Sequence, residues 1–485
     1  MFNIKKLTID KVLKAIAVLI KGYILYALIF GVILFGFHRH RESDYIDTHS
    51  VDRFFGSEIC QDEVVLLEDR YESGIARINL IENAEETLDV AYYTIHEGVS
   101  TNVFLGSLLD AADRGVKVRF ILDGIFHNLR GNLKDTIYAF SIHPNIELKF
   151  YEPFDLFRPW RWNNVLHDKI IIVDGHLAMI GGRNIGDKYF ANDDYDKPTV
   201  DDRDVVILNT DEKNIKSSVI WQMQEYFNNL WEHDFSKYPV MHLTQKQQKK
   251  GYEYIVYLHD YVDTIRKTKP DIFGNNINWM SISIPTKNIT LIHNPLERLN
   301  KEPWCLYEIT NLMKKARHSV FIQSPYVIPT KKLLKPFEGE KLTVDRIDIL
   351  TNSLASSPNY FASAGYRKYR TKIIDYGVNI YEYQGSGSIH AKSFIFDDKI
   401  SLIGSFNIDP RSAYLSTETM VVIDSEEFAT HLREKIDKKL DNSLQVAEDY
   451  SYVKKSHIEE KNIPWKKLFT VKALSLIAYF FDYML

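Results

Sequence analysis

The chain of 485 residues has very little cysteine. Cys60 and Cys305 are the only two, so the sequence can form neither a disulfide framework nor a zinc site built from cysteines. It also lacks a surplus of basic residues, because the formal net charge is −5 and the pI is about 6.4. Dedicated nucleic-acid binders usually carry such a surplus, so nucleic acid is not an expected partner. The apolar fraction of 45% excludes a disordered chain and predicts a globular protein.

Apolar runs long enough to span a bilayer are also scarce, with one exception near the N-terminus. Residues 15–37 are apolar apart from Lys21 and Gly22, and 23 residues are about enough to span a bilayer. A cleaved signal peptide usually has a shorter apolar region, and the basic stretch 38–41 follows here in place of a cleavage site. We therefore predict an uncleaved membrane anchor. More basic residues precede it than follow it, which favours an N-terminus inside the cell.

What the chain does contain is one short motif in two copies. The pattern H-x-K-x-x-x-x-D is formed once by His167, Lys169 and Asp174 and once by His390, Lys392 and Asp397. An asparagine follows each histidine after 17 residues, namely Asn184 and Asn407. Apolar residues between the lysine and the aspartate predict a buried strand in each copy. One such match arises easily by chance, but two with the same spacing do not.

The segments before each motif also correspond. Strands are predicted at 87–93, 116–122 and 145–151 in the first half and at 319–326, 346–350 and 377–383 in the second. Helices predicted at 71–84 and 102–114 alternate with the strands of the first half. The two motifs are 223 residues apart. We therefore predict a duplicated chain of two layered α/β halves, in which much of each sheet is parallel.

The predicted division of the chain follows from these segments. We expect a basic N-terminus at 1–14, a transmembrane helix at 15–37, a linker at 38–70, the first half at 71–240, a connector or insertion at 241–300, the second half at 301–445 and a C-terminal helical segment at 446–485. The last segment combines lysines with aromatic and aliphatic residues, as membrane-interfacial helices do. A terminal helix packed on the domain would have the same pattern.

Histidine, lysine and asparagine in this arrangement suit the cleavage of a phosphodiester. The lysine ammonium and the asparagine amide can donate to phosphoryl oxygens. A histidine and a lysine two positions apart lie on one face of a strand, so both can point at the same phosphorus. One histidine can attack and the other can protonate the leaving oxygen, after which water or an alcohol attacks the phosphohistidine. Two lysines and two asparagines replace a metal ion, so we predict neither a metal nor another cofactor.

Further residues near the motifs are candidates for supporting roles. Asp204 and Glu418 each precede an apolar strand, and we predict that they fix the tautomers of the histidines. Asp174 and Asp397 are included among the candidate catalytic residues, although a role in the turns that they start is favoured. The candidate substrate-binding residues are Arg183, Ser405 and Arg411. A surface ion pair is the alternative role for the two arginines.

Aromatic and basic residues are interleaved in the stretch 151–162. Trp160 and Trp162 lie beside Arg158 and Arg161, a combination that suits the head groups of phospholipids. We therefore predict that the two tryptophans bind substrate. A loop packed under the active site is the alternative.

Taken together, the two motifs resemble those of the phospholipase D superfamily. The stretches 181–187, 350–355, 364–366 and 404–412 are similar to bacterial cardiolipin synthases, above all to the type that uses phosphatidylethanolamine as well as phosphatidylglycerol. The resemblance implies two α/β halves related by a pseudo-twofold axis, with the site between them. It also implies phosphatidyl transfer through a phosphohistidine, with His167 as the nucleophile and His390 as the acid and base. Many such synthases have two N-terminal spans, whereas this chain shows one.

Several activities are compatible with the motifs. The resemblance favours a phosphatidyltransferase that makes cardiolipin, anchored in the bacterial cytoplasmic (inner) membrane, with phosphatidylglycerol and phosphatidylethanolamine as substrates. A phospholipase D that hydrolyses phospholipids to phosphatidic acid would share every step up to the covalent intermediate. The acidic net charge and the anchor oppose a nuclease of the same superfamily. The two intact motifs oppose a non-enzymatic membrane scaffold.

Overall fold

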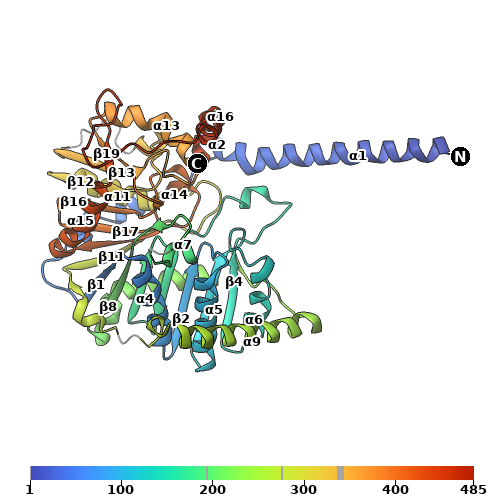
Figure 1. Ribbon diagram of the computed structural model, residues 1–485, viewed down its shortest axis with the longest axis horizontal. Coiled ribbons are helices and arrows are strands. Elements are labelled where there is room, and N and C mark those ends of the chain that lie inside the picture. Colours follow the sequence, from blue (N-terminus) through green and yellow to red (C-terminus); the bar gives the residue numbers. More distant parts are fainter. Residues whose placement is uncertain (1, 193–194, 275–276, 336–342) are drawn as a thin grey trace.

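The computed structural model describes residues 2–192, 195–274, 277–335 and 343–485. Two β-sheets with flanking helices form the body of the molecule, and a long N-terminal helix projects from it (Figure 1). Each half of the sequence supplies one of the two large sheets. The predicted α/β fold with two duplicated halves is therefore confirmed.

The first sheet is mixed. It consists of β1 (Asp62–Leu67), β2 (Thr87–Tyr92), β3 (Lys117–Asp123), β4 (Ile146–Tyr151), β5 (Lys169–Val173), β6 (Leu177–Gly181), β8 (Asp204–Asn209), β9 (Ser236–Lys237) and β10 (Ile284–Pro285). Across the sheet the order is β10-β1-β8-β6-β5-β2-β3-β4-β9. Only β2, β3 and β4 pair in parallel among these described strands, so less of the sheet is parallel than the sequence predicts.

The second sheet repeats this order. It consists of β11 (Asn288–His293), β12 (Ser319–Gln323), β13 (Arg346–Asn352), β14 (Asn379–Tyr383), β16 (Ser393–Phe396), β17 (Ile400–Gly404), β18 (Thr419–Asp424) and β19 (Ser443–Gln445). Across the sheet the order is β11-β18-β17-β16-β12-β13-β14-β19. Strand for strand this matches β1 to β9 of the first sheet, as a duplication requires. Each motif strand, β5 or β16, lies in the middle of its sheet.

The helices cover the outer faces of the sheets and fill the space between them. They are α3 (Tyr45–Thr48), α4 (Arg70–Glu82), α5 (Val99–Asp113), α6 (Thr136–Ile142), α7 (Asp187–Phe190), α8 (Val219–Glu232), α9 (Gln245–Thr268), α10 (Trp279–Ile282), α11 (Trp304–Lys315), α12 (Lys331–Leu334), α13 (Tyr360–Asp375), α14 (Pro410–Tyr414), α15 (Glu426–Leu440) and α16 (Trp465–Phe481). One apolar core is shared by both sheets, α8 and α15. The outer faces are covered by two further cores.

The continuous apolar run of the first motif follows from this layering. Ile170 and Ile172 of β5 belong to the core between the sheets, whereas Ile171 and Val173 belong to the core on the outer face. Because successive side chains of a strand point to opposite faces, a strand that is buried on both faces must be apolar at every position.

Two segments predicted as linkers are parts of the sheets. The segment 38–70 contains β1, which pairs with β8. The segment 241–300 contains β10 in the first sheet and β11 in the second, and its helix α9 packs on α5 and α6. Both halves therefore extend beyond the boundaries expected from the sequence.

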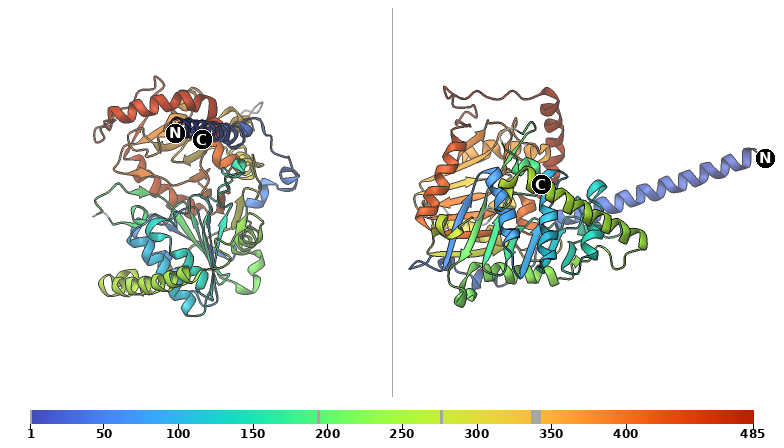
Figure 2. Two further views of the ribbon diagram at one scale, coloured as in Figure 1. Left: turned by 90° about the vertical axis from the view of Figure 1, so that its right-hand side faces the viewer. Right: turned by 60° about the horizontal axis from the view of Figure 1, so that its bottom comes forward.

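The C-terminus lies near the point at which the N-terminal helix leaves the body (Figure 1). The N-terminal helix runs through α1 (Phe2–Leu28), a π-helical turn η1 (Ile29–Ile33) and α2 (Leu34–Phe37). In the described chain, one helix is long and apolar enough to cross a membrane, at Lys11–Phe37. The C-terminus lies at the base of this helix in both views of Figure 2, and the Tyr483 hydroxyl donates to the carbonyl of Val32.

Candidate active site

The two motif histidines lie at the interface between the halves. His167 lies two residues before β5 and His390 lies three residues before β16, at the end of each strand that faces the other half. His167 Nδ1 is 3.0 Å from Glu418 Oε2, and His390 Nδ1 is 2.5 Å from Asp202 Oδ2. Each histidine is therefore held by a carboxylate of the opposite half, as expected of a pseudo-twofold pair. Lys169 and Lys392 act on both imidazoles, so the two rings lie beside one shared space.

Asp202, and not Asp204, is the counterpart of Glu418. In the sheet register Gly181 pairs with Asp204, and the corresponding glycine of the second half, Gly404, pairs with Met420. Asp204 is thus equivalent to Met420, and the predicted role of Asp204 in holding a histidine is wrong. Its carboxylate lies 2.8 Å from Nη1 of Arg183 and 3.0 Å from Nη2 of Arg77, both buried. It forms an ion pair with each of these two guanidinium groups inside the first half.

The motif lysines bring positive charge to the same place. Lys169 and Lys392 are both buried, and each donates to the carbonyl oxygen of the histidine in its own motif. Nζ of Lys392 is 2.7 Å from Nδ1 of His390 and 3.8 Å from Asp202. Burial and repulsion by Lys392 lower the pKa of Lys169 to about 7. An anionic ligand between the two lysines would relieve this repulsion.

The same charges act on the histidines. Burial, Lys169 and Lys392 hold the pKa of His167 well below its usual value. Burial and Lys392 lower the pKa of His390 to about 4, against the opposing effect of Asp202. Both imidazoles are therefore neutral near pH 7 in the free protein, with Nδ1–H directed to a carboxylate and the Nε2 lone pair available.

The two carboxylates differ in their ionisation. Burial would raise the pKa of Asp202, but Lys392 and His390 outweigh it and hold this pKa well below its usual range. Burial raises the pKa of Glu418 to about 8, against the opposing effects of Lys169 and the Ser405 hydroxyl. At neutral pH His390 therefore faces a full negative charge, and His167 faces a largely neutral carboxyl group.

The motif asparagines lie in equivalent buried positions. Nδ2 of Asn184 is 3.2 Å from the Tyr189 hydroxyl, and Nδ2 of Asn407 is 3.3 Å from the Ser412 hydroxyl. In both, Oδ1 has no partner among the described residues. A half-turn of each amide would let the hydroxyl donate to Oδ1 and would free an N–H group for a phosphoryl oxygen. The geometry thus suits the predicted role of both asparagines.

Comparison with known proteins agrees with this arrangement. The family described as "Cardiolipin synthase, PLD-like domain" matches residues 78–231 and 309–440. The chain belongs to this family of phospholipase D-like proteins.

Individual relatives point the same way. Over 411 residues the chain is 31% identical to an uncharacterized protein of Helicobacter pylori strain J99, which covers 76% of this chain and 77% of that protein. Over 402 residues it is 31% identical to cardiolipin synthase C of Escherichia coli, with 75% and 81% covered. A crystal structure of phosphatidylserine synthase from Haemophilus influenzae has the same fold, with a TM-score of 0.58 and 15% identity over 87% of this chain and 95% of that one.

Two predicted substrate-binding residues have internal roles in this phospholipase D-like chain. Arg183 is fully buried and donates to Asp204 and to the carbonyls of Leu67 and Glu68. Ser405 is also buried, and its hydroxyl donates to Oε2 of Glu418 at 2.5 Å. Both predictions are therefore wrong, because neither side chain is directed at the shared space. Ser405 positions the carboxyl group that holds His167.

Arg411 remains a candidate for substrate binding. Its charge adds to the burial that lowers the pKa of His167, and it opposes the burial that raises the pKa of Tyr93. The rings of these two residues lie 5.2 Å apart, so the guanidinium lies near the site. Nη2 donates to Asn163 Oδ1 at 3.3 Å and to the Met484 carbonyl at 3.1 Å. The C-terminus therefore reaches the edge of the active site.

Asp174 and Asp397, included among the candidate catalytic residues, lie at the opposite ends of the motif strands. Each carboxylate accepts three consecutive backbone N–H groups. For Asp174 these belong to Glu85, Glu86 and Thr87, and for Asp397 they belong to Arg317, His318 and Ser319. Both aspartates have positive φ angles, 49° and 51°, in the tight turn after the strand. The structure contradicts a catalytic role and supports the turn role that the sequence favoured.

Several residues near the histidines were not predicted. Tyr93 packs against His167, and Tyr189 and Tyr326 pack against His390 with ring centroids 6.3 and 6.2 Å away. Asp168, the middle residue of the first motif, is fully buried and accepts from three hydroxyl groups. The sequence signal for Asp168 is a charged residue between the motif histidine and lysine, directly before an apolar strand that is expected to be buried.

The predicted aromatic loop packs against the N-terminal helix. Trp160, in the short helix η4 (Pro159–Arg161), lies 6.1 Å from the ring of Phe30, and Trp162 stacks on Phe154. Asn163 Nδ2 donates to the Gly31 carbonyl at 2.7 Å. The two tryptophans therefore contact the N-terminal helix and the loop itself, and a direct contact with substrate stays a prediction.

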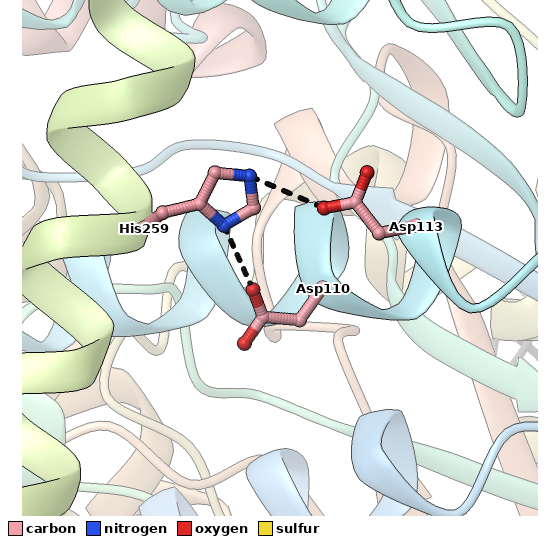
Figure 3. Close-up of side chains that lie close together, drawn as sticks. All are labelled: Asp110, Asp113 and His259. Carbon is pink, nitrogen blue, oxygen red and sulfur yellow. Dashed lines mark hydrogen bonds and ion pairs between the residues drawn. The ribbon is translucent and has the colours of Figure 1, made fainter.

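One cluster outside this site has the composition of a metal site. Figure 3 shows the imidazole of His259, on α9, between the carboxylates of Asp110 and Asp113, on α5. Nδ1 faces Asp110 at 3.1 Å and Nε2 faces Asp113 at 3.2 Å, so one ion could not use both nitrogens. Arg266 lies 2.9 Å from the other oxygen of Asp110. We interpret the cluster as an ion-pair network that fastens α9 to α5.

Proposed function

We propose that the protein is a membrane-anchored phosphatidyltransferase that makes cardiolipin through a phosphohistidine. The observation that carries this proposal is the crosswise hold on the two histidines, each by a carboxyl group of the other half. Family membership supports the substrate class, and the similarity to cardiolipin synthase C supports the product. The apolar helix at Lys11–Phe37 supports anchoring in the bacterial inner membrane.

The first step transfers a phosphatidyl group to the protein. Nε2 of His167 attacks the phosphorus of a phospholipid such as phosphatidylglycerol. His390 takes up a proton at Nε2 when the anionic substrate binds between the lysines. The P–N bond forms, the P–O bond to the head-group alcohol breaks, and this proton passes from Nε2 of His390 to the leaving oxygen. Lys169, Lys392 and the two motif asparagines donate to the phosphoryl oxygens as negative charge develops.

The second step releases the group to an acceptor. Nε2 of His390, now neutral, takes the proton from a hydroxyl of a second phospholipid, whose oxygen attacks the phosphorus. The new P–O bond forms and the P–N bond to His167 breaks. Phosphatidylglycerol or phosphatidylethanolamine can serve in this cycle as the resemblance implies, and water in place of the acceptor would give phosphatidic acid.

The electrostatics favour this division of roles. Ionised Asp202 stabilises a positive charge on His390, as an acid requires. Glu418, whose pKa is raised to about 8, gives His167 a weaker partner and so leaves it neutral and nucleophilic. A bound phosphodiester adds negative charge beside both lysines and offsets the repulsion that lowers the histidine pKa values.

Product analysis tests the activity. Purified full-length protein in liposomes receives labelled phosphatidylglycerol with and without phosphatidylethanolamine. Labelled cardiolipin is the expected product, whereas phosphatidic acid alone would make the protein a hydrolase and no turnover would overturn the proposal. His167→Ala and His390→Ala should each slow turnover by on the order of 10²–10⁴. The exposed His318→Ala is the matched control and should leave the rate unchanged.

The roles of the two histidines can be separated with a donor whose leaving group needs no protonation, such as a phosphatidyl nitrophenyl ester. His390→Ala should still form the covalent intermediate and accumulate it, because the second step lacks its base. His167→Ala should take up no label. Label that accumulates in His167→Ala and not in His390→Ala would show that the roles are reversed.

A further inference from the structure

We propose that α16 and the loop 152–163 form a second membrane-binding surface, which rests on the lipid bilayer beside the N-terminal helix and opens the active site toward it. This inference rests on the proposed anchor and goes beyond it. It assigns a location at the membrane to two segments that are far apart in the sequence, and it commits to a lipid surface as the occupant.

Helix α16 has one packed face and one exposed face. Val471 and Ala478 are buried and share a small core with Ala364 of α13. On the other side lies an apolar stripe at helical spacing, in which the exposed fractions are 72% for Trp465, 69% for Phe469, 73% for Leu476 and 70% for Phe480. Soluble surfaces seldom expose a contiguous patch of this kind unless it binds a partner.

The loop 152–163 exposes a second set of apolar side chains next to the N-terminal helix. Phe154, Leu156 and Phe157 are exposed. The loop is held on the helix by the Tyr23 hydroxyl, which donates to the Leu156 carbonyl at 3.0 Å, and by the Tyr26 hydroxyl, which donates to the Phe157 carbonyl at 2.6 Å. Both tyrosines lie near the middle of the apolar helix, so the loop packs along its side.

The length of the anchor places both elements at the bilayer surface. The apolar helix Lys11–Phe37 has 27 residues, or about 40 Å, whereas the hydrocarbon core of a bilayer is about 30 Å thick. The body of the protein contacts the end of this helix, where Asn163 donates to the Gly31 carbonyl and Tyr483 to the Val32 carbonyl. Gly31 and Val32 lie in the last two turns of the helix, at the level of the lipid head groups. The loop 152–163, which is held by Tyr23 and Tyr26, reaches roughly 10 Å further along the helix into the bilayer.

The direction of α16 fits a helix that lies on a surface. In Figure 1 α1 is seen along its length, whereas α16 is seen nearly end-on. The left view of Figure 2 looks at the side from which α1 projects, and there α16 runs across the view. A bilayer crossed by α1 would therefore have α16 along its surface. Lys466 and Lys472, both exposed, suit the phosphate groups of anionic lipids at that depth.

Both elements meet at the active site. Arg411 donates through Nη2 to Asn163 at the end of the loop and to the carbonyl of Met484, and its backbone N–H donates to the carbonyl of Leu485. Asn163 is only four residues from His167. A phospholipid could thus enter from the bilayer beside Arg411 without passing through water.

Depth measurement on the full chain tests this surface. In a Cys60→Ser background, which leaves Cys305 buried, single cysteines at Phe469, Leu476 and Phe480 receive a nitroxide, and the protein is placed one copy per nanodisc containing anionic lipid. Matched labels are placed at Leu19 on α1 and at Ile59 just before β1, both exposed. Collisions with oxygen, which concentrates in lipid, and with a water-soluble nickel chelate report the depth of each label.

We expect the α16 labels to resemble Leu19, with strong oxygen and weak nickel collisions, and Ile59 to show the reverse. If the α16 labels resemble Ile59 while Leu19 lies in lipid, the inference fails and the anchor stands. If Leu19 also lies in water, the anchor itself is refuted. Labels shielded from both reagents, with broadening between chains at two copies per disc, would assign the stripe to a second copy and overturn the proposal.

A variant gives an independent readout. Phe469→Ser, Leu476→Ser and Phe480→Ser combined should lower transfer on liposome substrates by roughly tenfold, because apolar area is lost from the bilayer contact. The rate on a short-chain phospholipid below its micelle concentration should not change. Ile59→Ser is the matched surface control. Equal losses on both substrates would indicate damage to the fold, and no loss on liposomes would count against the surface.

Discussion

The first and second halves place a carboxyl group beside each other's histidine, but they fasten it by different means. Glu418, which holds His167, lies between Thr417 and Thr419, and both threonine hydroxyls donate to Asp168, at 2.8 and 3.1 Å. Asp168 is the middle residue of the first motif. Asp168 of the first half thus holds the segment around Glu418 in the second half. It does so through the two threonines, whose side chains point away from the Glu418 side of the strand. This pair of hydrogen bonds is called the clamp.

The second motif has Ala391 at the position of Asp168, so it cannot form such a clamp. Asp202 is held through the backbone instead, by pairing of β7 (Val200–Asp201) with β15 (Ser388–Ile389), and the N–H of His390 donates to the Asp201 carbonyl at 2.6 Å. Arg203, the residue after Asp202, donates to Ser393 at the start of β16. The two motif histidines therefore have different neighbours, although the motifs themselves are alike.

The comparison shows how a duplicated chain can give two copies of one motif different tasks. Asp202 is surrounded by cations and stays ionised, whereas Glu418 is buried beside Asp168 with fewer compensating charges. In the proposed mechanism, the distinction between nucleophile and acid would come from the carboxyl groups that hold the histidines and not from the motifs themselves.

The largest difference between the halves is expected when the two carboxyl groups are replaced. Asp202→Asn removes a full negative charge from His390 and should lower kcat by on the order of 10³–10⁴. Glu418→Gln resembles the neutral form of a carboxyl group whose pKa is about 8, so the loss at pH 7 should be about tenfold smaller. Turnover of labelled phosphatidylglycerol in liposomes measures both.

The pH dependence sharpens this test. Glu418 ionises only as the pH rises through about 8, so the deficit of Glu418→Gln should grow above pH 8, while the deficit of Asp202→Asn stays constant from pH 6 to 9. Equal losses in both variants at pH 7 would mean that the two halves are electrostatically equivalent. The exposed His318→Ala again serves as the control.

Much of the fold follows from the sequence because the duplication is visible in it. The segments predicted as strands at 87–93, 116–122 and 145–151 are β2, β3 and β4. The antiparallel part was missed because β1 pairs with β8, about 140 residues later, and has charged residues at its start. Helix α9 was missed because most of it is exposed, with only Gly251, Leu258 and Val262 buried.

The residues that each half contributes through its own motif could be predicted from the sequence. The carboxyl group with which each half holds the histidine of the other half could not. Both histidines, lysines and asparagines follow from the motif spacing. Asp202 does not, since it lies 188 residues from His390, and Glu418 lies 251 residues from His167. The choice of Asp204 over Asp202 is an error of two positions, and a shift of two keeps the same face of a strand, so periodicity could not correct it.

The clamp on Glu418 gives the next test. Asp168→Ala gives the first motif the residue found in the second and releases both threonines. Because Glu418 then loses its fixed position, turnover should fall on the order of 10²-fold. A structural loss alone would not change the tautomer of His167, so the signal of its Nδ1–H in ¹⁵N NMR is the second readout and should disappear.

Tyr226→Phe is the matched control for this variant. It removes a third donor to the same carboxylate, at 2.7 Å, and leaves both threonines in place. It should lower the free energy of unfolding by about 1 kcal/mol without altering turnover or the His167 signal. Asp168→Asn, whose amide oxygen can still accept a threonine, should restore part of the rate. Equal behaviour of Asp168→Ala and Tyr226→Phe would refute the clamp.

The smallest effect is expected where the halves agree. Asp174→Asn and Asp397→Asn each replace a carboxylate that accepts three backbone N–H groups by an amide, which has a single acceptor oxygen. Each variant should lose about 1–3 kcal/mol of unfolding free energy with unchanged turnover. Chemical denaturation at pH 7 measures the free energy. A loss of turnover in either variant at full stability would return these aspartates to the catalytic set.

Stability at low pH tests whether the contribution of Asp397 depends on its charge. Partial burial would raise its pKa, but the N–H groups of Ser319, Arg317 and His318 outweigh burial and lower it. A carboxyl group with a lowered folded-state pKa stabilises the fold above its unfolded pKa of about 3.9, and this stabilisation is lost as the pH falls through the folded value. The difference between wild type and Asp397→Asn should therefore be constant from pH 5 to 7 and shrink below pH 4. A difference that persists at pH 2 would mean that the turn depends on the shape of the side chain and not on its charge.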